Sequence, residues 1–455
     1  MIVQCPKQYD SLLIRGGRVI DPANQVDRVQ DILIRDGKIA AIGKLDAQQA
    51  DKIINASPFI VVPGLIDMHV HLREPGREEE ETIASGTRAA ANGGFTSVAC
   101  MPNTQPVIDG VDVIEMILNR ASSCGLVNVY PIASITKMAK WQEGKRAGGQ
   151  EGQNSATLSA GEILTDIPRL LEAGAVAFSN DGKTVMNAEL MRRALMLSAK
   201  YNFPVIAHCE DHNLSAGGVM NSGKISEKLN LKGIPNCAED VIVARDIILA
   251  EATGGHIHIA HVSTAGSVRL IREAKRRGVK VTAEATPHHF TLTEVAVEQY
   301  GANAKMSPPL RTQADVDAVI EGLRDGTIDA IVTDHAPHAT FEKEKGMLEA
   351  HFGIIGMETC VPLVITQLVE GGHLSLSEAI AKLTYIPAKI INLPRGTLSV
   401  GATADITLVD LQKEAKVDPN RFESKSRNTP FAGWTLRGWP VMTIVGGRIV
   451  ADNRL

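Results

Sequence analysis

Eight short apolar segments, separated by longer amphipathic ones, limit the folds open to this chain. The apolar segments are rich in Val, Ile and Ala and cover residues 65–73, 95–103, 128–136, 175–181, 204–210, 256–263, 280–286 and 329–334. Helix-like stretches lie between them, among them residues 187–201, 238–252, 265–277 and 313–325. Strands that are covered on both faces and alternate with helices predict an α/β fold, a (β/α)8 TIM-like barrel. A doubly wound open sheet is the alternative, but polar residues collect at the ends of the whole set of strands and not at one switch point.

The two ends of the chain show a different pattern. Residues 11–20, 29–42, 398–410 and 440–450 are short alternating segments, and Asp-Gly and Gly-Gly turns join them. We therefore expect residues 1–58 and 391–455 to form one small composite β-sandwich domain, and residues 59–390 to form the barrel. The segment 143–159 is rich in Gly, Gln and Ser and is predicted to be a mobile loop.

Composition argues against several kinds of partner. The chain has 455 residues, of which 44% are hydrophobic and 22% charged, and a net charge of −5. Without a block of Lys or Arg, this mild acidity argues against nucleic acid and anionic membranes and favours a small-molecule substrate. No apolar stretch approaches the roughly 20 residues of a membrane helix, and the first ten residues lack the apolar core of a signal peptide, so we expect a cytoplasmic protein. Six cysteines without a Cys-x-x-Cys pair argue against a thiolate zinc site.

Histidines and aspartates gather where the predicted strands end. They are His69 and His71 on the first strand, Asp181 on the fourth, His208 on the fifth, His261 on the sixth and Asp334 on the eighth. Taken singly, each is more often a hydrogen-bonded core histidine or a cap aspartate, but in a barrel all of them would meet at one mouth. Four imidazoles and two carboxylates suit two divalent metal ions, with zinc favoured, that share a bridging carboxylate and a bridging hydroxide.

The sixth predicted strand carries a second His-x-His pair, His256 and His258. If His261 faces the barrel axis, strand alternation places the odd-numbered residues of that strand on the same side. We therefore expect His256 and His258 to point outward, toward the helices, and to take no part in metal binding. His288 and His289, at the end of the seventh strand, are expected to support a loop.

The motifs around these strand ends resemble those of amidohydrolases, and specifically those of bacterial class I dihydroorotases. The matching motifs span nearly the whole chain and are DMHVHLREPG at 67–76, MPNT at 101–104, FSNDG at 178–182, HCED at 208–211, HVST at 261–264 and TDHAPH at 333–338. Carried over position by position, the resemblance implies two zinc ions, one on His69, His71 and Asp334 and the other on His208 and His261, with Asp181 and a hydroxide as bridges. It also implies that the substrate carboxylate is bound by Arg73, Asn103 and His338.

The reaction that this resemblance implies is the zinc-dependent, reversible cyclisation of N-carbamoyl-L-aspartate to L-dihydroorotate in de novo pyrimidine biosynthesis. In the hydrolytic direction the bridging hydroxide attacks the ring amide carbonyl, and Asp334 carries its proton to the leaving nitrogen. Arg73 adds a two-pronged donor that suits the carboxylate of the substrate.

Hydantoinases, dihydropyrimidinases and allantoinases are related alternatives, and they typically bridge their metals with a carboxylated lysine on strand four. Ser179 stands at that position here and Asp181 offers a carboxylate instead, which favours a dihydroorotase. Lys183 shares the parity of Asp181, so a modified Lys183 is a further alternative. A non-catalytic dihydroorotase-like partner of aspartate carbamoyltransferase is another, but such relatives are expected to lose metal ligands and this chain keeps all six.

The sequence departs from the family pattern at two places. Ser307 stands before two prolines where the family usually has asparagine, and we expect this shorter side chain to contact the substrate ring through a bridging water. The segment 143–159 is longer than the corresponding loop of the family. We also expect a homo-oligomer, and association with aspartate carbamoyltransferase stays open.

Overall fold

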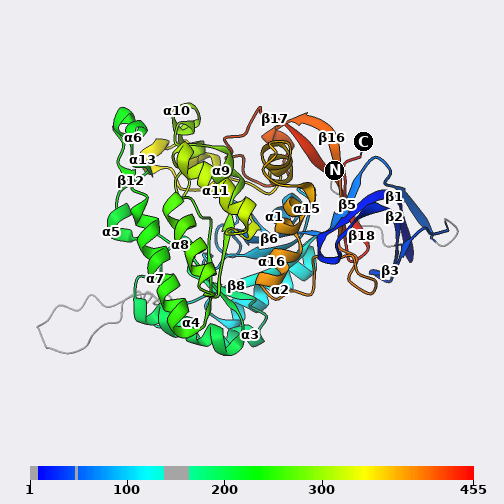
Figure 1. The fold of residues 1–455 in the computed structure, drawn as a ribbon, viewed down its shortest axis with the longest axis horizontal. Coiled ribbons are helices and arrows are strands. Elements are labelled where there is room, and N and C mark those ends of the chain that lie inside the picture. The colour runs from blue at the N-terminus through cyan, green and yellow to red at the C-terminus, as the bar shows by residue number, and fades with distance from the viewer. Residues whose placement is uncertain (1–8, 47–49, 138–162, 455) are drawn as a thin grey trace, which may run out of the picture.

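The computed structural model describes residues 9–46, 50–137 and 163–454 of the chain. The predicted loop at 143–159 lies outside the described residues. Figure 1 shows two parts, a barrel surrounded by helices and a β domain in which the blue start and the orange-red end of the chain lie side by side.

Eight parallel strands form the barrel and follow one another around it in sequence order. They are β6 (Leu65–Val70), β7 (Phe95–Cys100), β8 (Asn128–Ser134), β9 (Ala177–Ser179), β10 (Pro204–Ala207), β13 (His256–Ile259), β14 (Val281–Ala285) and β15 (Ala330–Ile331). The two ends of this sheet also meet, because Val70 of β6 pairs in parallel with His335, just beyond β15. This pairing closes the ring, so the predicted (β/α)8 barrel is confirmed and the open-sheet alternative is wrong.

Helices follow the strands and cover the outside of the barrel (Figure 1). The main ones are α1 (Ile83–Asn92), α2 (Val111–Cys124), α3 (Ile167–Glu172), α4 (Ala188–Tyr201), α7 (Cys237–Thr253), α8 (Ala265–Arg276), α11 (Gln313–Asp325), α15 (Leu376–Leu383) and α16 (Tyr385–Ile390). Side chains that accept hydrogen bonds from backbone N–H groups start several of them, as Asn187 does for α4 and Thr264 for α8. The predicted helices at 187–201, 238–252, 265–277 and 313–325 are confirmed within two residues.

Shorter elements lie in the loops that follow β10, β14 and β15. They are α5 (His212–Ser215), β11 (Met220–Asn221), α6 (Lys224–Leu229), β12 (Gly233–Ile234), α9 (Pro287–Thr291), α10 (Ala296–Tyr300), α12 (Thr340–Lys343), α13 (Gly346–Glu349) and α14 (Cys360–Leu363). These loops leave the carboxyl ends of the strands, which is the end where barrel enzymes place their active sites.

Apolar side chains from the barrel strands, the residues just after them and the end of α16 fill part of the barrel interior. The cluster consists of Met68, Ala99, Met101, Ile132, Ala177, Ile206, Ala260, Ala330, Val332, Ile390 and Ile391. A second and larger cluster packs the outward residues of the strands against the helices. The barrel is therefore filled, and a ligand can reach only its open end.

The β domain is one sheet of eight strands drawn from both ends of the chain. The strands are β1 (Ser11–Asp21), β2 (Val26–Arg35), β3 (Lys38–Gly43), β4 (Lys52–Asn55), β5 (Ile60–Pro63), β16 (Ile406–Lys416), β17 (Thr435–Val445) and β18 (Arg448–Asp452). β5 joins the two ends of the chain, because it pairs with β1 on one side and with β16 on the other. The predicted β domain built from both termini is confirmed, whereas its sandwich arrangement and the boundaries at 58/59 and 390/391 stay predictions.

Gly64 connects the β domain to the barrel. It lies between β5 and β6, and a Cβ atom at this position would come within 2.1 Å of the Thr96 hydroxyl oxygen. Only glycine lets the chain pass so close to β7 on its way into the first barrel strand.

Candidate metal centre

The six predicted metal ligands lie together at the mouth of the barrel. His69 and His71 come from the end of β6, and the others follow their strands directly, namely Asp181 after β9, His208 after β10, His261 after β13 and Asp334 after β15. Each has 6% or less of its surface exposed. Because parallel barrel strands all end at the same rim, the fold brings these distant positions into one buried site.

The Asp181 carboxylate lies among four imidazole rings. Its Oδ1 atom is 3.4 Å from His69 Nε2, 3.4 Å from His208 Nδ1 and 3.5 Å from His261 Nε2. Its Oδ2 atom is 3.4 Å from His71 Nε2. One carboxylate therefore faces the ring nitrogens of all four candidate histidines, which is the position that a bridging ligand would occupy.

The Asp334 carboxylate lies against the pair of histidines from β6. Its Oδ1 atom is 3.0 Å from His71 Nε2 and 3.5 Å from His69 Nε2. Ligand atoms from His69, His71 and Asp334 form one group that could hold a metal ion, and those from His69, Asp181 and His261 form another, each with its atoms within 4.8 Å of one another.

The spacing and the hydrogen bonding of these side chains fit bound cations. Atoms that coordinate one zinc ion at about 2.0–2.1 Å in a tetrahedron lie roughly 3.3 Å apart, close to the separations of the atoms around Asp181. Among the described residues, His69 Nε2, Asp181 Oδ1 and His261 Nδ1 are buried without a hydrogen-bond partner. Buried polar atoms normally have partners, and imidazole with carboxylate is a donor set that zinc accepts.

The electrostatics of the site also favour positive charge. Burial alone would raise the pKa of Asp181, but interactions with His69 and His208 outweigh it and hold that pKa well below its usual value. The pKa of Asp334 is lowered in the same way, with His69 as the main opposing influence to burial. Burial would lower the pKa of His69, yet the carboxylates of Asp181 and Glu284 raise it. Ionised carboxylates in a buried place favour the binding of cations.

Asn103 and Glu284 orient His71 and His69 by hydrogen bonds to the Nδ1 atoms of their rings. His71 Nδ1 lies 2.8 Å from Asn103 Oδ1, and His69 Nδ1 lies 2.5 Å from Glu284 Oε1. An acceptor at Nδ1 places the proton there and leaves the Nε2 lone pair toward the centre. Asn103 was predicted only as a substrate contact, and Glu284 was not predicted at all.

The prediction that His256 and His258 point outward is wrong. His258 is in register with Ile206, a member of the interior cluster, and its Nε2 atom lies 3.0 Å from Glu284 Oε2. The hydroxyl oxygen of Thr282 lies 2.8 Å from His258 Nδ1 and 2.7 Å from His256 Nε2. The rings of both histidines therefore hydrogen-bond inside the barrel and not with the helices.

His261 reaches the centre although it has the opposite parity from His258. β13 ends at Ile259, and His261 has a φ of 30°, in the left-handed region. Strand alternation no longer decides where a side chain points once the strand has ended. The expectation for His256 and His258 failed because it extended the alternation through this change of backbone.

A cavity of about 670 Å³ opens above the centre. Each residue predicted to contact the substrate lines it, namely Arg73, Asn103, Ser307 and His338. Five of the six candidate metal ligands also line it; His69 lies behind them, fully buried. The structure thus gathers the predicted ligands and the predicted substrate contacts around one space.

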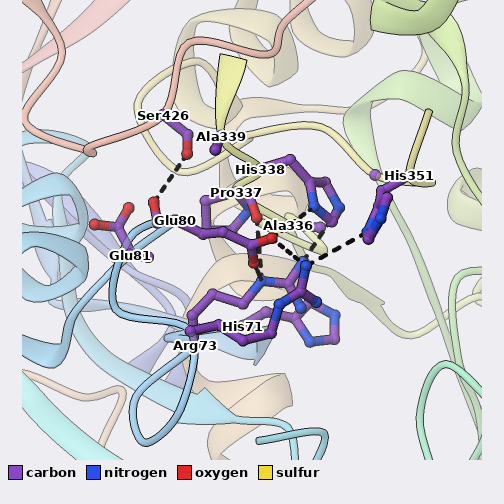
Figure 2. Close-up of polar contacts among 12 residues, drawn as sticks. His71, Arg73, Glu80, Glu81, Ala336, Pro337, His338, Ala339, His351 and Ser426 are labelled. Atoms are coloured by element: carbon purple, nitrogen blue, oxygen red, sulfur yellow. Dashed lines mark hydrogen bonds and ion pairs between the residues drawn. The ribbon is translucent and has the colours of Figure 1, made fainter. Parts of the chain in front are cut away.

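Arg73 is held in place at one side of this cavity. Its Nε atom lies 3.1 Å from the carbonyl oxygen of Pro337 and 3.0 Å from Glu80 Oε2, and its Nη2 atom lies 3.3 Å from His338 Nε2 (Figure 2). Burial lowers the pKa of Arg73 to about 10, so the guanidinium stays charged at neutral pH. Glu80, which balances this buried charge, was missed in the sequence.

The other two predicted substrate contacts have partners of their own. Ser307 Oγ donates a hydrogen bond of 3.2 Å to Glu210 Oε2, and His338 Nε2 lies 2.7 Å from the carbonyl oxygen of Phe352. His289 Nε2 lies 3.0 Å from the carbonyl oxygen of Pro308, a contact that agrees with its predicted role in supporting a loop. For His288, whose buried Nε2 atom has no hydrogen-bond partner among the described residues, that role stays a prediction.

The three acidic residues of the site that were not predicted, Glu284, Glu80 and Glu210, differ in how clearly the sequence indicates them. Glu284 stands inside a barrel strand whose other residues, apart from Thr282, are apolar, and a charged residue there is rarely buried without a partner. Glu80 and Glu210 lie in loops, where acids are common, and only Glu210 falls within a quoted motif, HCED at 208–211.

Comparison with known proteins identifies the family of this chain. The Amidohydrolase family profile matches residues 60–450. The chain is 54% identical over 441 residues to a dihydroorotase of Syntrophus aciditrophicus, covering 96% of this chain and 99% of that one. It is 55% identical over 447 residues to a dihydroorotase of Pelotomaculum thermopropionicum, covering 98% and 99%.

Among solved structures, an L-hydantoinase from Arthrobacter aurescens has a TM-score of 0.83 and 26% identity, covering 98% of this chain and 97% of that one. No helix in the part of the chain that the structure describes is long and apolar enough to cross a membrane. The chain belongs to the amidohydrolase family, and within it to the dihydroorotases.

Proposed function

We propose that this protein catalyses the reversible cyclisation of N-carbamoyl-L-aspartate to L-dihydroorotate, using two zinc ions at the mouth of its barrel. The observation that carries this proposal is the position of Arg73, a buried guanidinium that lines the same cavity as a centre organised around the Asp181 carboxylate. A fixed guanidinium suits a substrate with a carboxylate, and the linear and the cyclic compound share the carboxylate that takes no part in ring closure.

The metal ions would be held by the six buried side chains at the strand ends. One ion would bind His69, His71 and Asp334, the other would bind His208 and His261, and Asp181 would be shared between them. When bound, zinc supplies Lewis acidity, which polarises a carbonyl group and makes water a stronger nucleophile near neutral pH.

The protein's own residues bind and orient the substrate. Arg73 would pair with the substrate carboxylate through the guanidinium edge that Pro337 and Glu80 leave available. Asn103 and His338 line the cavity beside it and would complete the contact. Ser307 would reach the ring through a water molecule, because its side chain is shorter than the asparagine common in the family.

Asp334 would move the proton. In the direction of hydrolysis, water adds to the ring amide carbonyl, Asp334 accepts a proton from that water, and the same proton passes to the amide nitrogen as the ring bond breaks. Ring closure follows the same path in reverse. The surroundings of Asp334 lower its pKa, so its carboxylate is ionised at neutral pH.

Related activities fit the structure less well. A hydantoinase-type bridge would need a carboxylated lysine, but Ser179 is buried where it would stand and Lys183 is exposed. Asp181 already faces all four histidines. A non-catalytic partner of aspartate carbamoyltransferase would have no reason to keep six buried ligands around a cavity.

The remaining expectations concern the location of the enzyme in the cell, its oligomeric state and its protein partner. A cytoplasmic location, a homo-oligomer and association with aspartate carbamoyltransferase stay predictions from the sequence. They can be checked by fractionation, by light scattering on the purified protein, and by co-purification with the transferase.

A substrate comparison tests the proposed function. The zinc-loaded protein is assayed for hydrolysis of L-dihydroorotate, hydantoin and dihydrouracil, and for cyclisation of N-carbamoyl-L-aspartate. We expect turnover of dihydroorotate and carbamoyl aspartate alone. Faster hydrolysis of the rings without a carboxylate would contradict the role of Arg73. Stoichiometric binding to the transferase without any turnover would favour the scaffold alternative.

A further inference from the structure

A series of hydrogen-bonded polar side chains, buried except for the half-buried Thr282, runs through the barrel interior and ends at the metal centre. It passes from His256 to Thr282, His258, Glu284 and His69, with successive atoms 2.7, 2.8, 3.0 and 2.5 Å apart. His258, Glu284 and His69 are fully buried. Burying polar and charged groups in a barrel core is energetically unfavourable unless they are hydrogen-bonded, so their arrangement needs an explanation.

The direction of these hydrogen bonds follows from the chemistry of the groups. An ionised carboxylate only accepts hydrogen bonds, so Glu284 requires an N–H on His69 Nδ1 and on His258 Nε2. The Nδ1 atom of neutral His258 must then accept from the Thr282 hydroxyl, which in turn accepts from His256 Nε2. If each ring and hydroxyl carries one proton, all of these hydrogen bonds can form together in only one arrangement of donors and acceptors.

Glu284 contacts both halves of the centre. Its Oε1 atom accepts a hydrogen bond from the ring of His69 and lies 3.3 Å from the backbone nitrogen of His261. His261 has left-handed backbone geometry, which a non-glycine residue keeps only when its surroundings hold it. The same carboxylate therefore holds one ligand by its ring and another by its backbone.

We propose that Glu284, held by His258 and Thr282 in the barrel core, is a positioning residue that fixes His69 and His261 for metal binding. This inference rests on the proposed function, because it assumes that these histidines bind metal. Glu284 acts through the two histidines and does not touch the cavity. Groups that hydrogen-bond to metal-binding histidines commonly change metal affinity by about 10–100-fold.

Glu284→Gln is the central test, because it keeps the shape of the side chain and removes its charge. We expect the zinc dissociation constant, measured by competition with a chelating dye, to rise by about 10–100-fold. The visible absorption of the cobalt(II)-substituted protein should also change, since the geometry around the ion changes. The melting temperature of the metal-free protein should stay near that of the wild type.

Three further variants serve as controls. His258→Gln keeps a donor toward Glu284 and should retain wild-type zinc affinity, whereas His258→Leu removes the donor and should weaken zinc binding. Asp246→Asn makes the same carboxyl-to-amide change at a fully buried acid of α7 that is outside this chain of groups, and it should leave zinc affinity and the cobalt spectrum unchanged.

The outcomes separate this inference from the proposed function. If the wild type binds zinc and hydrolyses dihydroorotate but Glu284→Gln keeps the wild-type zinc affinity and cobalt spectrum, the positioning role is overturned and the proposed function stands. A large loss of melting temperature in metal-free Glu284→Gln would make Glu284 a structural residue and would also overturn the inference. A wild type that binds no zinc overturns both.

Discussion

Asn103 Oδ1 lies 2.8 Å from His71 Nδ1, which directs the Nε2 atom of His71 toward the carboxylates of Asp181 and Asp334. The same Asn103 side chain lines the substrate cavity. One residue thus connects the predicted metal centre with the predicted substrate contacts, so metal binding and substrate binding are expected to respond together to changes around His71.

Removing His71 tests the assignment of the metal ligands. His71→Ala is expected to bind fewer zinc ions per chain and to lose activity with them, because the remaining ligands of that ion cannot complete its coordination. Metal analysis of the purified protein measures this. His373→Ala, at an exposed histidine, is the control and should bind as much zinc as the wild type. Two zinc ions in His71→Ala would rule out the assignment.

Asp334→Asn tests the proton transfer. An amide cannot accept and release the proton, so we expect the rate of dihydroorotate hydrolysis to fall by roughly 100-fold or more, the usual contribution of general acid–base catalysis. Zinc content should be measured on the same sample, so that loss of metal is told apart from loss of the base. A near-normal rate at full zinc content would exclude the mechanism.

Arg73→Lys tests the carboxylate contact. Lysine keeps the charge but replaces a planar two-pronged donor with a single ammonium group. We expect KM for dihydroorotate to rise by roughly tenfold or more, since a hydrogen bond to a charged group contributes about 1.5–3 kcal/mol, while kcat changes less. An unchanged KM would place the substrate carboxylate elsewhere.

Asp246 predicts a pH dependence of stability that is separate from the active site. It is fully buried in α7, and its Oδ2 atom has no hydrogen-bond partner among the described residues. Burial raises the pKa of Asp246 from 3.8 to about 6, although Arg245 opposes the rise. The folded protein therefore binds this proton more tightly than the unfolded chain, and the resulting stability is lost as pH rises from about 4 through about 6.

Asp246→Asn should remove this dependence. One pKa unit corresponds to about 1.4 kcal/mol, and the carboxyl group of the unfolded chain is already partly ionised at pH 4. The free energy of unfolding of the variant, relative to that of the wild type, should therefore rise by roughly 2.5 kcal/mol between pH 4 and pH 7. Urea unfolding of both proteins at several pH values measures the difference. Parallel curves across this range would show that Asp246 titrates as it does in the unfolded chain.

The fold was predictable because its signals are periodic and repeated. Eight apolar segments alternating with helices predicted the barrel, and the helices at 187–201 and 265–277 begin in the structure where Asn187 and Thr264 accept hydrogen bonds from backbone N–H groups. The β domain was visible from its turns at both ends of the chain. Its pairing was not, because the role of β5 as the strand between β1 and β16 depends on contacts between residues more than 300 positions apart.

The residues of the site were predictable where a strand end fixed their position. His69 and His208 needed only the rule that barrel strands end at one rim. The orientation of side chains in the barrel interior was not predictable in the same way. His261 turns inward through left-handed backbone geometry, which the sequence does not mark, and this reversed the expected direction of His258.

Zinc titration of the metal-free protein tests the central claim most directly. Zinc is added in known amounts while the rate of dihydroorotate hydrolysis is followed, and bound zinc is measured in the same samples. Two zinc ions on six buried side chains predict that activity rises with bound metal and reaches its plateau at two ions per chain. Full activity of the metal-free protein, or a plateau at one ion per chain, would contradict the two-zinc centre.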